Sequence, residues 1–587
     1  MDRKAWIIII LCVAGLFWSQ YEAQKQAKAY QAALAVEKAR AAAQATREPS
    51  PGSTVSAALP AAVAAVSQAP ALVSNLPTVT KKLRSPTAEY TFTSAGGLQQ
   101  VELLGHKGKN GAHIFINGTS TVPIGDVSDD PLKWGEAEEA VKEISEKAIT
   151  LESILPSGLQ ISKTFTVGKS DVVKDDYQIK YDITFSNPGV AKLDFKPWYV
   201  STGAAIPIHE NDQAHYLSFD YQAGAKTVYK SITNLEAGRI PLIGIQTSAE
   251  KAEIRESASG ILWAGTKNQY FSTMLQPLGD LRGDRIWTSR YPLPQSKSEE
   301  TKLHAITGAL GFPAFSLAPG ESKTHSFKFY AGPKEYSRLK TLGAQQEGAM
   351  EFGFFGFFSS SLLQAMNWIH SFVKNYGIAI ILLTLIIKTG LWTIQNKSMK
   401  SMRKMSLLAP KMTELKEKYK DDPARMNQEV MKLYKDYGVN PFAGCLPMLV
   451  QMPIFFGFYS MLAVAVELRN SSFLWVDDLS QPDTVAHLGG IPVNILPLVM
   501  AATMLWQMQL TPKTGDSSQQ KIFMIMPVFF LFICYNYASA LALYWTVQNI
   551  FSVVQLYMTR NAPLPELIKV NAVPANAKAA KLTKAKR

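Results

Sequence analysis

The sequence is poor in cysteine and lacks the short motifs that mark many enzymes. Its 587 residues include three cysteines, Cys12, Cys445 and Cys534, and each lies in an apolar segment. This pattern excludes a disulfide framework and a CxxC metal site. The sequence also has no phosphate-binding glycine loop, nucleophile elbow or HExxH motif. We therefore expect no metal, no cofactor and no enzymatic activity.

Negative charge is in the minority, because 60 Lys and Arg oppose 47 Asp and Glu and the formal net charge is +13. An excess of this size is compatible with nucleic-acid binding. Here, however, the basic residues flank long apolar runs, where the positive-inside rule for membrane proteins predicts them. We therefore expect contact with a lipid bilayer and no direct binding of DNA.

Charge is absent, or nearly absent, from five long runs that we expect to cross a membrane. These runs are residues 5–21, 376–394, 442–466, 491–510 and 522–559. The last run has 38 residues. As one helix it would be about 57 Å long, whereas the hydrocarbon layer is about 30 Å thick. It should therefore form two helices with a turn near the Ala-Ser-Ala at 538–540, which gives six transmembrane helices.

Basic residues set the expected orientation of these helices. Arg3 and Lys4 precede the first run and keep the amino terminus in the cytoplasm. We interpret residues 1–22 as a retained membrane anchor, and a cleaved secretion signal is the alternative. With six spans the basic tail at 560–587 also lies in the cytoplasm, and the long region after the first run is exported.

The exported region has the period of β-strands. It begins with an Ala-, Pro- and Ser-rich segment, 23–79, that is typical of a flexible linker. Further along, Tyr177, Ile179 and Tyr181 alternate with polar residues, as a half-buried strand requires. Many such strands with short turns predict a large antiparallel β-sandwich over 80–345.

Two features of this region leave alternatives open. His209, Glu210 and Asp212 form its densest titratable cluster; an exposed polar loop explains them, and a membrane-tethered carbohydrate-binding or mutarotase-like enzyme is the alternative. Residues 351–374 are aromatic and amphipathic, which predicts a helix lying in the membrane interface. The alternative is that its phenylalanines, 354–358, pack on the sandwich.

The segment 396–438 is expected to be a cytoplasmic helical hairpin. It contains 11 Lys and Arg and 6 Asp and Glu, which places it inside by the charge rule. Met405, Leu408 and Met412 begin an apolar seam with coiled-coil spacing, and Asp422-Pro423 predicts the start of a second helix. The charged outer faces suit contact with a ribosome or a nascent chain; a solvated connector is the alternative.

Lys388 is the one charged residue in the run 376–394. A charge at the centre of a bilayer costs about 3 kcal/mol on insertion scales, so such a residue usually faces a polar cavity or a partner. The other runs contain amide side chains, which in membrane proteins often hold helices together. Combined with Lys388, they predict a polar cavity within the membrane. They include Gln451, Gln507, Asn536 and Asn549. A transporter or channel that uses Lys388 as an ion site is the alternative function.

The third run carries a specific motif, NPxxGCxPxxxQxPI. Its residues are Asn440, Pro441, Gly444, Cys445, Pro447, Gln451 and Pro453. Together with the MDRKAW start, FKFYAGPK at 327–334 and LYW at 543–545, the motif resembles the YidC/Oxa1/Alb3 family of membrane-protein insertases, in particular the YidC type of Gram-negative bacteria. The resemblance covers nearly the whole chain.

The resemblance implies a core of five helices, spans two to six, around a hydrophilic groove. That groove would open to the cytoplasm and to lipid and would be closed to the periplasm. The family's groove charge, usually Arg, corresponds here to Lys388, with Thr384 on the same face. Lysine keeps the charge but loses the planar bidentate fork of arginine.

The resemblance also implies a greasy slide for the substrate helix, although helix packing is the other role open to the same side chains. The residues are Met448, Met452, Phe455, Phe529, Phe530, Tyr544 and Trp545. The family's Pro-Ser-Gly turn is replaced here by the Ala-Ser-Ala at 538–540, and its second Tyr by Trp545.

The implied function is insertion and folding of newly made integral membrane proteins in the bacterial inner membrane, alone or with the Sec translocon and its accessory subunits. Nascent membrane proteins and the bilayer are the expected partners, with ribosome contact through the hairpin and the basic tail. The exported region resembles the family's periplasmic β-supersandwich.

The expected chain plan follows from these predictions. It comprises an anchor (1–22), a linker (23–79), a periplasmic β-domain (80–345), an interfacial helix (346–375), transmembrane helix 2 (376–395), the cytoplasmic hairpin (396–440), transmembrane helix 3 (441–466), a periplasmic loop (467–490), transmembrane helix 4 (491–510), a cytoplasmic loop (511–521), transmembrane helices 5 (522–537) and 6 (541–559), and the tail (560–587).

Overall fold

The computed structural model describes most of the chain after residue 79. The described residues are 80–108, 111–118, 120, 122–135, 139–209, 212–237, 248–293, 304–440, 446–488, 491–512, 517–560, 567 and 569. They belong to one compact unit, Ala69–Arg587. The expected anchor and linker, and most of the basic tail, lie outside the described residues.

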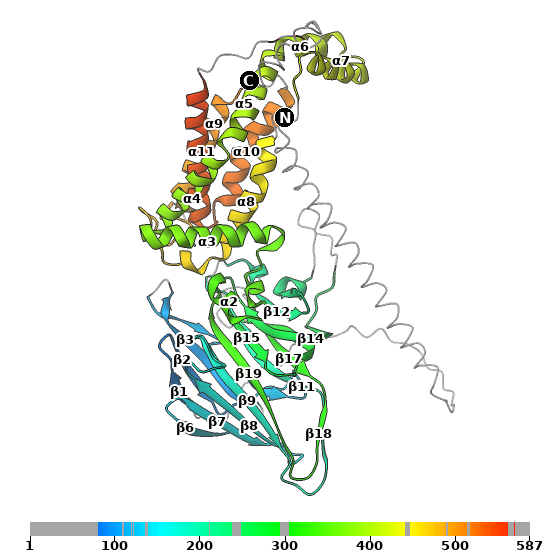
Figure 1. Cartoon of the computed structure of the whole chain (residues 1–587), viewed down its shortest axis with the longest axis vertical. Helices are drawn as coiled ribbons and strands as arrows, with labels where there is room; N and C mark the ends of the chain where they lie inside the picture. The colour runs from blue at the N-terminus through cyan, green and yellow to red at the C-terminus, as the bar shows by residue number, and fades with distance from the viewer. Residues whose placement is uncertain are drawn as a thin grey trace, which may run out of the picture. The chain divides into compact units, whose positions relative to one another are not determined.

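The first part of this unit is built from β-strands, all paired antiparallel (Figure 1). The strands are β1 (Thr80–Arg84), β2 (Ala88–Thr93), β3 (Gly97–Lys107), β4 (His113–Ile116), β5 (Val127–Ser128), β6 (Ala140–Ser145), β7 (Ala148–Ile154), β8 (Gln160–Val167), β9 (Gln178–Ser186), β10 (Leu193–Phe195), β11 (Trp198–Ala205), β12 (Ser218–Ala223), β13 (Lys226–Ser231), β14 (Glu253–Lys267), β15 (Phe271–Pro277), β16 (Gly283–Pro292), β17 (His304–Phe312), β18 (Phe315–Leu317) and β19 (Ser322–Pro333). The antiparallel β-domain predicted from the alternation is confirmed.

One large sheet of 13 strands dominates this domain, in the order β5-β11-β17-β16-β14-β15-β19-β9-β8-β7-β6, with β12 attached to β14 and β13 attached to β12. A sheet of four strands, β1-β2-β3-β4, accompanies it. In β9, every second residue from Ile179 to Phe185 is buried, so the expected alternation is confirmed. These rings join an aromatic core in which Trp198 packs on Phe312 with ring centroids 4.6 Å apart.

The second part of the unit is mainly helical (Figure 1). Its helices are α2 (Tyr336–Leu342), α3 (Gly356–Val373), α4 (Tyr376–Gly390), α5 (Trp392–Leu407), α6 (Ala409–Lys418), α7 (Pro423–Asp436), α8 (Leu446–Val464), α9 (Ile495–Leu510), α10 (Ser517–Cys534) and α11 (Ser539–Arg560), and a two-stranded hairpin, β20 (Thr484–Leu488) and β21 (Ile491–Asn494), precedes α9. Helix α11 packs against α4 and α9, and α3 lies across α4 and α8.

The amphipathic pattern of α3 is visible in its burial. Leu362, Leu363 and Met366 are buried, whereas Phe357 is 78% exposed and Trp368 is also exposed. A side chain at Gly457 of α8 would come within 2.9 Å of Phe358 on α3, so the two helices approach closely. The apolar outer face of α3 is therefore left without a partner among the described residues.

The helix expected over 376–395 is interrupted. The described helices include none that is both long and apolar enough to cross a bilayer alone; only α4 and α5 together reach that length and composition, and their axes differ by 60°. The break falls at Leu391, directly after Gly390. Glycine is a poor helix former and a common site of sharp kinks, which accounts for the departure from the expected continuous helix.

The hairpin of α6 and α7 has the predicted local signals. Pro410 lies in the first turn of α6, and the Asp422 side chain accepts a hydrogen bond from the backbone N–H of Arg425 at the start of α7. Met405, Leu408 and Met412 form a buried cluster with α7, as the seam predicts. The most buried residue of α7 is Tyr434, whose O–H donates to Met412 Sδ at 3.1 Å.

The long run 522–559 is divided between α10, which ends at Cys534, and α11, which begins at Ser539. The N–H groups of Ser539 and Ala540 donate to the carbonyls of Gln481 and Leu479 at 2.9 and 3.0 Å. The first turn of α11, whose N–H groups have no partner within the helix, is therefore capped by the loop that precedes β20.

Candidate functional site around Lys388

Lys388 lies in the last turn of α4 and is only 4% exposed. Its ammonium donates to Ser552 Oγ on α11 at 3.3 Å. The Ser552 hydroxyl in turn donates to the backbone carbonyl of Gln548 at 2.9 Å. Among the residues that the structure describes, no Asp or Glu forms an ion pair with Lys388. The lysine is thus buried against a neutral hydroxyl.

A chain of amides extends this polar region from α11 to α8. Gln451 Nε2 on α8 donates to Gln548 Oε1 at 3.0 Å and lies 3.4 Å from the Tyr544 hydroxyl. On α4, Thr384 is buried one turn before Lys388 and donates to the carbonyl of Ile380 at 2.7 Å. The structure therefore brings Gln451 into the network next to Lys388, and the two are linked through α11.

The other predicted polar residues lie elsewhere. Asn549 is buried toward α9, where its amide donates to Met500 O at 3.3 Å and Thr503 Oγ1 at 3.2 Å. Gln507 is half-buried on α9. Asn536 is exposed in the turn between α10 and α11, about 20 Å along α11 from Ser552 at 1.5 Å per residue. Asn549 thus joins α11 to α9, and Asn536 lies far from the lysine.

The aromatic residues predicted for a slide fall into two groups. Trp545 on α11 packs edge-on against Phe455 of α8, at 4.9 Å, and against Phe530 of α10, at 4.5 Å. Met452 and Phe529 are exposed beside this cluster, whereas Tyr544 is buried and stacks on Phe458 at 4.1 Å. Tyr544 therefore packs inside the helices. The side chain of Met448 lies outside the described residues.

The motif of the third run is described only in part. Pro453 is buried within α8, and because proline has no N–H, the carbonyl of Leu449 receives no helix hydrogen bond from it. Asn440 is exposed after α7. Pro441, Gly444 and Cys445, and the side chain of Pro447, lie outside the described residues.

Sequence reasoning missed Ser552, the residue that Lys388 contacts. A signal for it was present, because one face of α11 carries polar residues at steps of four, three and four. They are Gln548, Ser552, Gln555 and Thr559. The same stripe contacts α5, where Gln555 Nε2 donates to Asn396 Oδ1 at 2.9 Å. Residues on one helix face recur at this spacing, so the stripe marks the side of α11 that faces α4 and α5.

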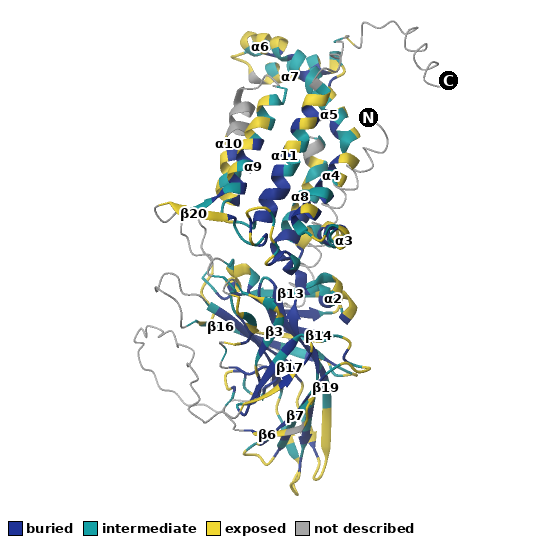
Figure 2. Ribbon diagram, turned by 90° about the vertical axis from the view of Figure 1, so that its left-hand side faces the viewer, coloured by how far each residue is buried: buried dark blue, intermediate teal, exposed yellow. Residues whose placement is uncertain are grey.

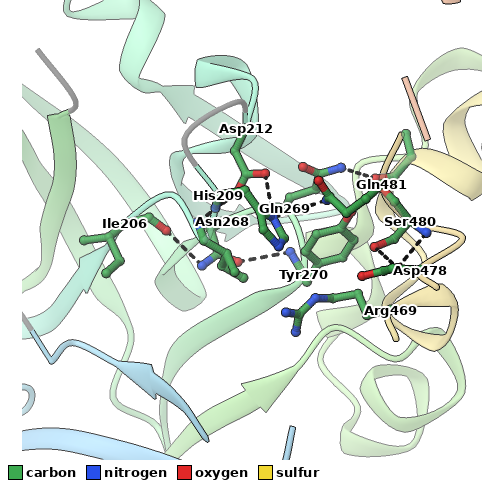
Figure 3. A network of polar contacts seen from close by, with 12 residues as sticks. Ile206, His209, Asp212, Asn268, Gln269, Tyr270, Arg469, Asp478, Ser480 and Gln481 are labelled. Atoms are coloured by element: carbon green, nitrogen blue, oxygen red, sulfur yellow. Dashed lines mark hydrogen bonds and ion pairs between the residues drawn. The ribbon is translucent and has the colours of Figure 1, made fainter. Parts of the chain in front are cut away.

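The alternative site in the β-domain has a structural role (Figure 3). Asp212 Oδ2 accepts from the backbone N–H of Ile208 at 2.7 Å and of His209 at 3.0 Å. His209 Nδ1 lies 3.1 Å from Asp212 Oδ1 and 3.2 Å from Gln481 Nε2, in the loop before β20. These contacts join the β-domain to that loop. Glu210, the third member of the predicted cluster, lies outside the described residues.

Further contacts strengthen the same junction (Figure 3). Gln269 Nε2 donates to the carbonyl of Ala463, near the end of α8, at 2.6 Å. The guanidinium of Arg469 lies over the rings of Tyr270 and Phe271, 5.3 and 5.2 Å from their centroids, and burial lowers the pKa of Arg469. The β-domain and the loop after α8 are thus joined by side chains that pack on one another and are largely removed from water.

Comparison with known proteins agrees with this division of the chain. A family model described as "YidC periplasmic domain" matches residues 88–365, and one described as "60Kd inner membrane protein" matches residues 368–565. A relative described as "Membrane protein insertase YidC" from Geobacter sulfurreducens is 30% identical over 81% of this chain and 84% of its own length. The chain therefore belongs to the YidC family of membrane protein insertases, which are proteins of the inner membrane.

Another relative of the same description, from Syntrophobacter fumaroxidans, is 46% identical over 41% of this chain, and the match spans 45% of that protein's length, less than half. Among solved structures, a YidC insertase crystal structure that resolves the first transmembrane domain aligns with 83% of this chain and 94% of its own. The alignment has 19% identity and a TM-score of 0.34.

Proposed function

We propose that this chain is an insertase that inserts newly made integral membrane proteins into the inner membrane and helps them fold, alone or with the Sec translocon. Membership of the YidC family supports the proposal, and Lys388 is the observation that carries it. A buried ammonium that contacts only a neutral hydroxyl, among the described residues, is costly unless a charged or polar partner compensates it. An acidic group on a substrate would be such a partner.

In this mechanism Lys388 transiently attracts acidic residues in the short exported tail of a substrate. The attraction between two charges grows as the effective dielectric falls, so it is stronger beside α4 and α11 than in water. The hydroxyl and amides of Ser552, Gln548 and Gln451 would line a hydrophilic groove that shortens the dry distance for the tail. No nucleotide is required.

The substrate helix would then leave sideways into lipid past the cluster of Phe455, Phe530 and Trp545. Methionine and aromatic side chains suit a surface that accepts many sequences, and the exposed Met452 and Phe529 border the same cluster. Burial of the apolar substrate helix in the bilayer supplies the driving force.

The proposed topology has six spans, of which five form the core, with both termini in the cytoplasm and the β-domain in the periplasm. Helices α8, α9, α10 and α11 would each form part of a different span. Helix α3 would lie in the lipid–water interface of the outer leaflet. The hairpin of α6 and α7, with its exposed charges, and the basic tail would contact the ribosome.

Insertion by purified protein in sealed vesicles tests the electrostatic step. Lys388→Ala should lower the initial rate for a single-span substrate with an acidic tail about tenfold, which corresponds to roughly 1.4 kcal/mol of barrier. A substrate with a neutral tail should be affected far less. Lys388→Arg keeps the charge and should retain most of the rate, and Lys374→Ala, at an exposed lysine after α3, is the matched control. Equal rates for Lys388→Ala and the unchanged protein on the acidic substrate would contradict the proposal.

A further inference from the structure

The hairpin of β20 and β21 exposes apolar side chains without an evident structural use. Every residue of β20 is exposed; Leu488, at its end, is 71% exposed, and Val485 is exposed as well. Soluble proteins expose single apolar side chains often, but contiguous apolar patches mark sites that contact a partner or a membrane. We therefore expect a partner or a membrane to cover the exposed face of the hairpin.

The hairpin is held firmly in this position. Thr484 Oγ1 donates to Asn494 Oδ1 at 2.6 Å, which closes its open end. Asn494 Nδ2 donates to the carbonyl of Tyr535 at 2.6 Å, and the Tyr535 hydroxyl donates to Pro492 O at 2.6 Å. These bonds fix the hairpin to the turn between α10 and α11. The exposure of Leu488 is thus set by the fold.

A second set of bonds joins the hairpin to the start of α9. Asp483 Oδ2 accepts from the backbone N–H of Leu496 at 2.7 Å and from Trp475 Nε1 at 3.1 Å. Trp475 is exposed beside Leu474, which is 76% exposed. The exposed apolar side chains of this region are therefore Leu474 and Trp475 in the loop, Val485 and Leu488 on β20, and Leu498 near the start of α9.

The composition of the hairpin indicates lipid. Residues 484–494 contain no Lys, Arg, Asp or Glu, and the hairpin is bonded to Tyr535, directly after α10, where Phe532 and Ile533 are exposed. Figure 2 shows β20 beside the ends of the helices, on the side away from α3. Tryptophan is enriched at the boundary between lipid and water, and the exposed Trp475 donates to Asp483, directly before β20.

We propose that the β20–β21 hairpin is an interfacial anchor whose exposed strand β20 lies among the headgroups and upper acyl chains of the outer leaflet. Its depth is limited, because the outer edges of a two-stranded hairpin carry backbone groups without a partner, and such groups are costly in hydrocarbon. Pro492 removes one of these donors from β21. The proposal rests on the proposed span through α9.

Fluorescence of a single NBD label in vesicles of phosphatidylethanolamine and phosphatidylglycerol tests the anchor. The full chain, with Cys12, Cys445 and Cys534 replaced by Ser, would carry Leu488→Cys, Leu498→Cys or Val190→Cys in turn. Val190 is the matched control, since it is apolar and 98% exposed in the β-domain. Iodide should quench the label at 488 about five-fold less than the label at 190, and a doxyl group high on the lipid chain should quench it more than a deep one, as for an interfacial segment.

The outcomes separate this proposal from the one on which it rests. Iodide quenching at 488 equal to that at 190 would overturn the anchor, and so would protection at 488 from both iodide and doxyl lipid, because a protein would then cover the hairpin. Quenching at 498 by iodide would instead overturn the span through α9. The Leu498→Cys label should report deeper lipid than the label at 488 if both hold.

Discussion

Buried lysines are treated differently in the two halves of the molecule. In the β-domain, Lys163 is fully buried and pairs with Glu139 Oε1 at 2.6 Å and Asp126 Oδ1 at 3.1 Å. Burial alone would lower the pKa of Lys163, but the charges and hydrogen bonds of the two acids outweigh burial and raise it. The chain supplies the counter-charge for this lysine itself.

Lys267 repeats the arrangement, with Asp220 Oδ2 and Glu351 Oε2 each at 2.7 Å. Lys334 is a third case, because it is buried without such a pair among the described residues, and burial together with the charge of Lys267 holds its pKa well below the ordinary value. A buried lysine in the β-domain is therefore either paired or biased toward the neutral form.

Among the described residues, Lys388 pairs with no acid, and its ammonium hydrogen-bonds to the hydroxyl of Ser552. The difference suggests why a lysine would be kept at this place. A lysine that is paired with an acid of the same chain is already neutralised in the resting protein, so a substrate carboxylate would gain little by approaching it. A lysine that faces a hydroxyl can still gain from an incoming carboxylate, which is what the proposed insertion step requires.

The largest expected effect is on stability, and it sharpens this comparison. Lys163→Met leaves Glu139 and Asp126 buried without their cation and should destabilise the β-domain by about 3–5 kcal/mol, as is typical when one partner of a buried pair is removed. Lys388→Met leaves no acid unpaired among the described residues and, as a swap of similar volume, should cost less than about 1.5 kcal/mol. Urea unfolding of the detergent-solubilised full chain, followed by tryptophan fluorescence, measures both. Equal losses would show that the two lysines have the same structural role.

A second experiment removes the difference between Lys388 and Lys163 by giving Lys388 an acid partner within the chain. Ser552→Asp places a carboxylate where the lysine now meets a hydroxyl at 3.3 Å, so that Lys388 would resemble Lys163. The internal acid should compete with the acidic tail of a substrate and lower its insertion rate about tenfold, or roughly 1.4 kcal/mol. Ser552→Asn has a similar shape without the charge and should have little effect.

If Ser552→Asp left the rate for an acidic tail unchanged while Lys388→Ala reduced it, the role of Lys388 would not be attraction of a carboxylate. The same variant read out with a neutral tail reports any general damage to the helices, because that substrate does not depend on the proposed ion pair.

These residues also show what the sequence could and could not predict. Local signals were sufficient for the alternation in β9 and for the cap at Asp422, because each depends on neighbours in the chain. The contact between Lys388 and Ser552 depends on how α4 packs on α11. The rotation of each helix about its own axis cannot be inferred from the residue pattern of one sequence. The polar stripe on α11 could be recognised in the sequence, but the helix that it contacts could not.

The same limit applies to α7 and to the end of α4. On α7, Leu433 packs against the buried cluster of the hairpin, but the most buried side chain of the helix is the neighbouring Tyr434. The hydroxyl of Tyr434 donates to Met412 Sδ on α6 at 3.1 Å. The break at Leu391 was missed since glycine is tolerated inside many helices at a cost of about 1 kcal/mol.

The smallest expected effect concerns a third kind of base, a half-buried histidine held neutral. His106 packs edge-on against Phe271 with ring centroids 5.3 Å apart. Burial, and then the charges of Arg469 and Arg338, lower its pKa from 6.5 to about 4. Between these values the unfolded chain binds more protons than the folded protein, so this contribution to stability is complete above pH 6.5 and is lost as the pH falls toward 4.

His106→Gln should therefore flatten the fall in melting temperature between pH 7 and pH 4.5, by about 2–4 °C for a β-domain of this size. His487→Gln, at an exposed histidine of β20, should leave the fall unchanged. Scanning calorimetry of the full chain in detergent measures both. Unlike the paired Lys163, His106 has no acid partner among the described residues to stabilise its charged form, so protonation should loosen the junction with Arg469. A steeper fall in His106→Gln than in the unchanged protein would show that the ring is already protonated at neutral pH and that the sign of its contribution is the reverse.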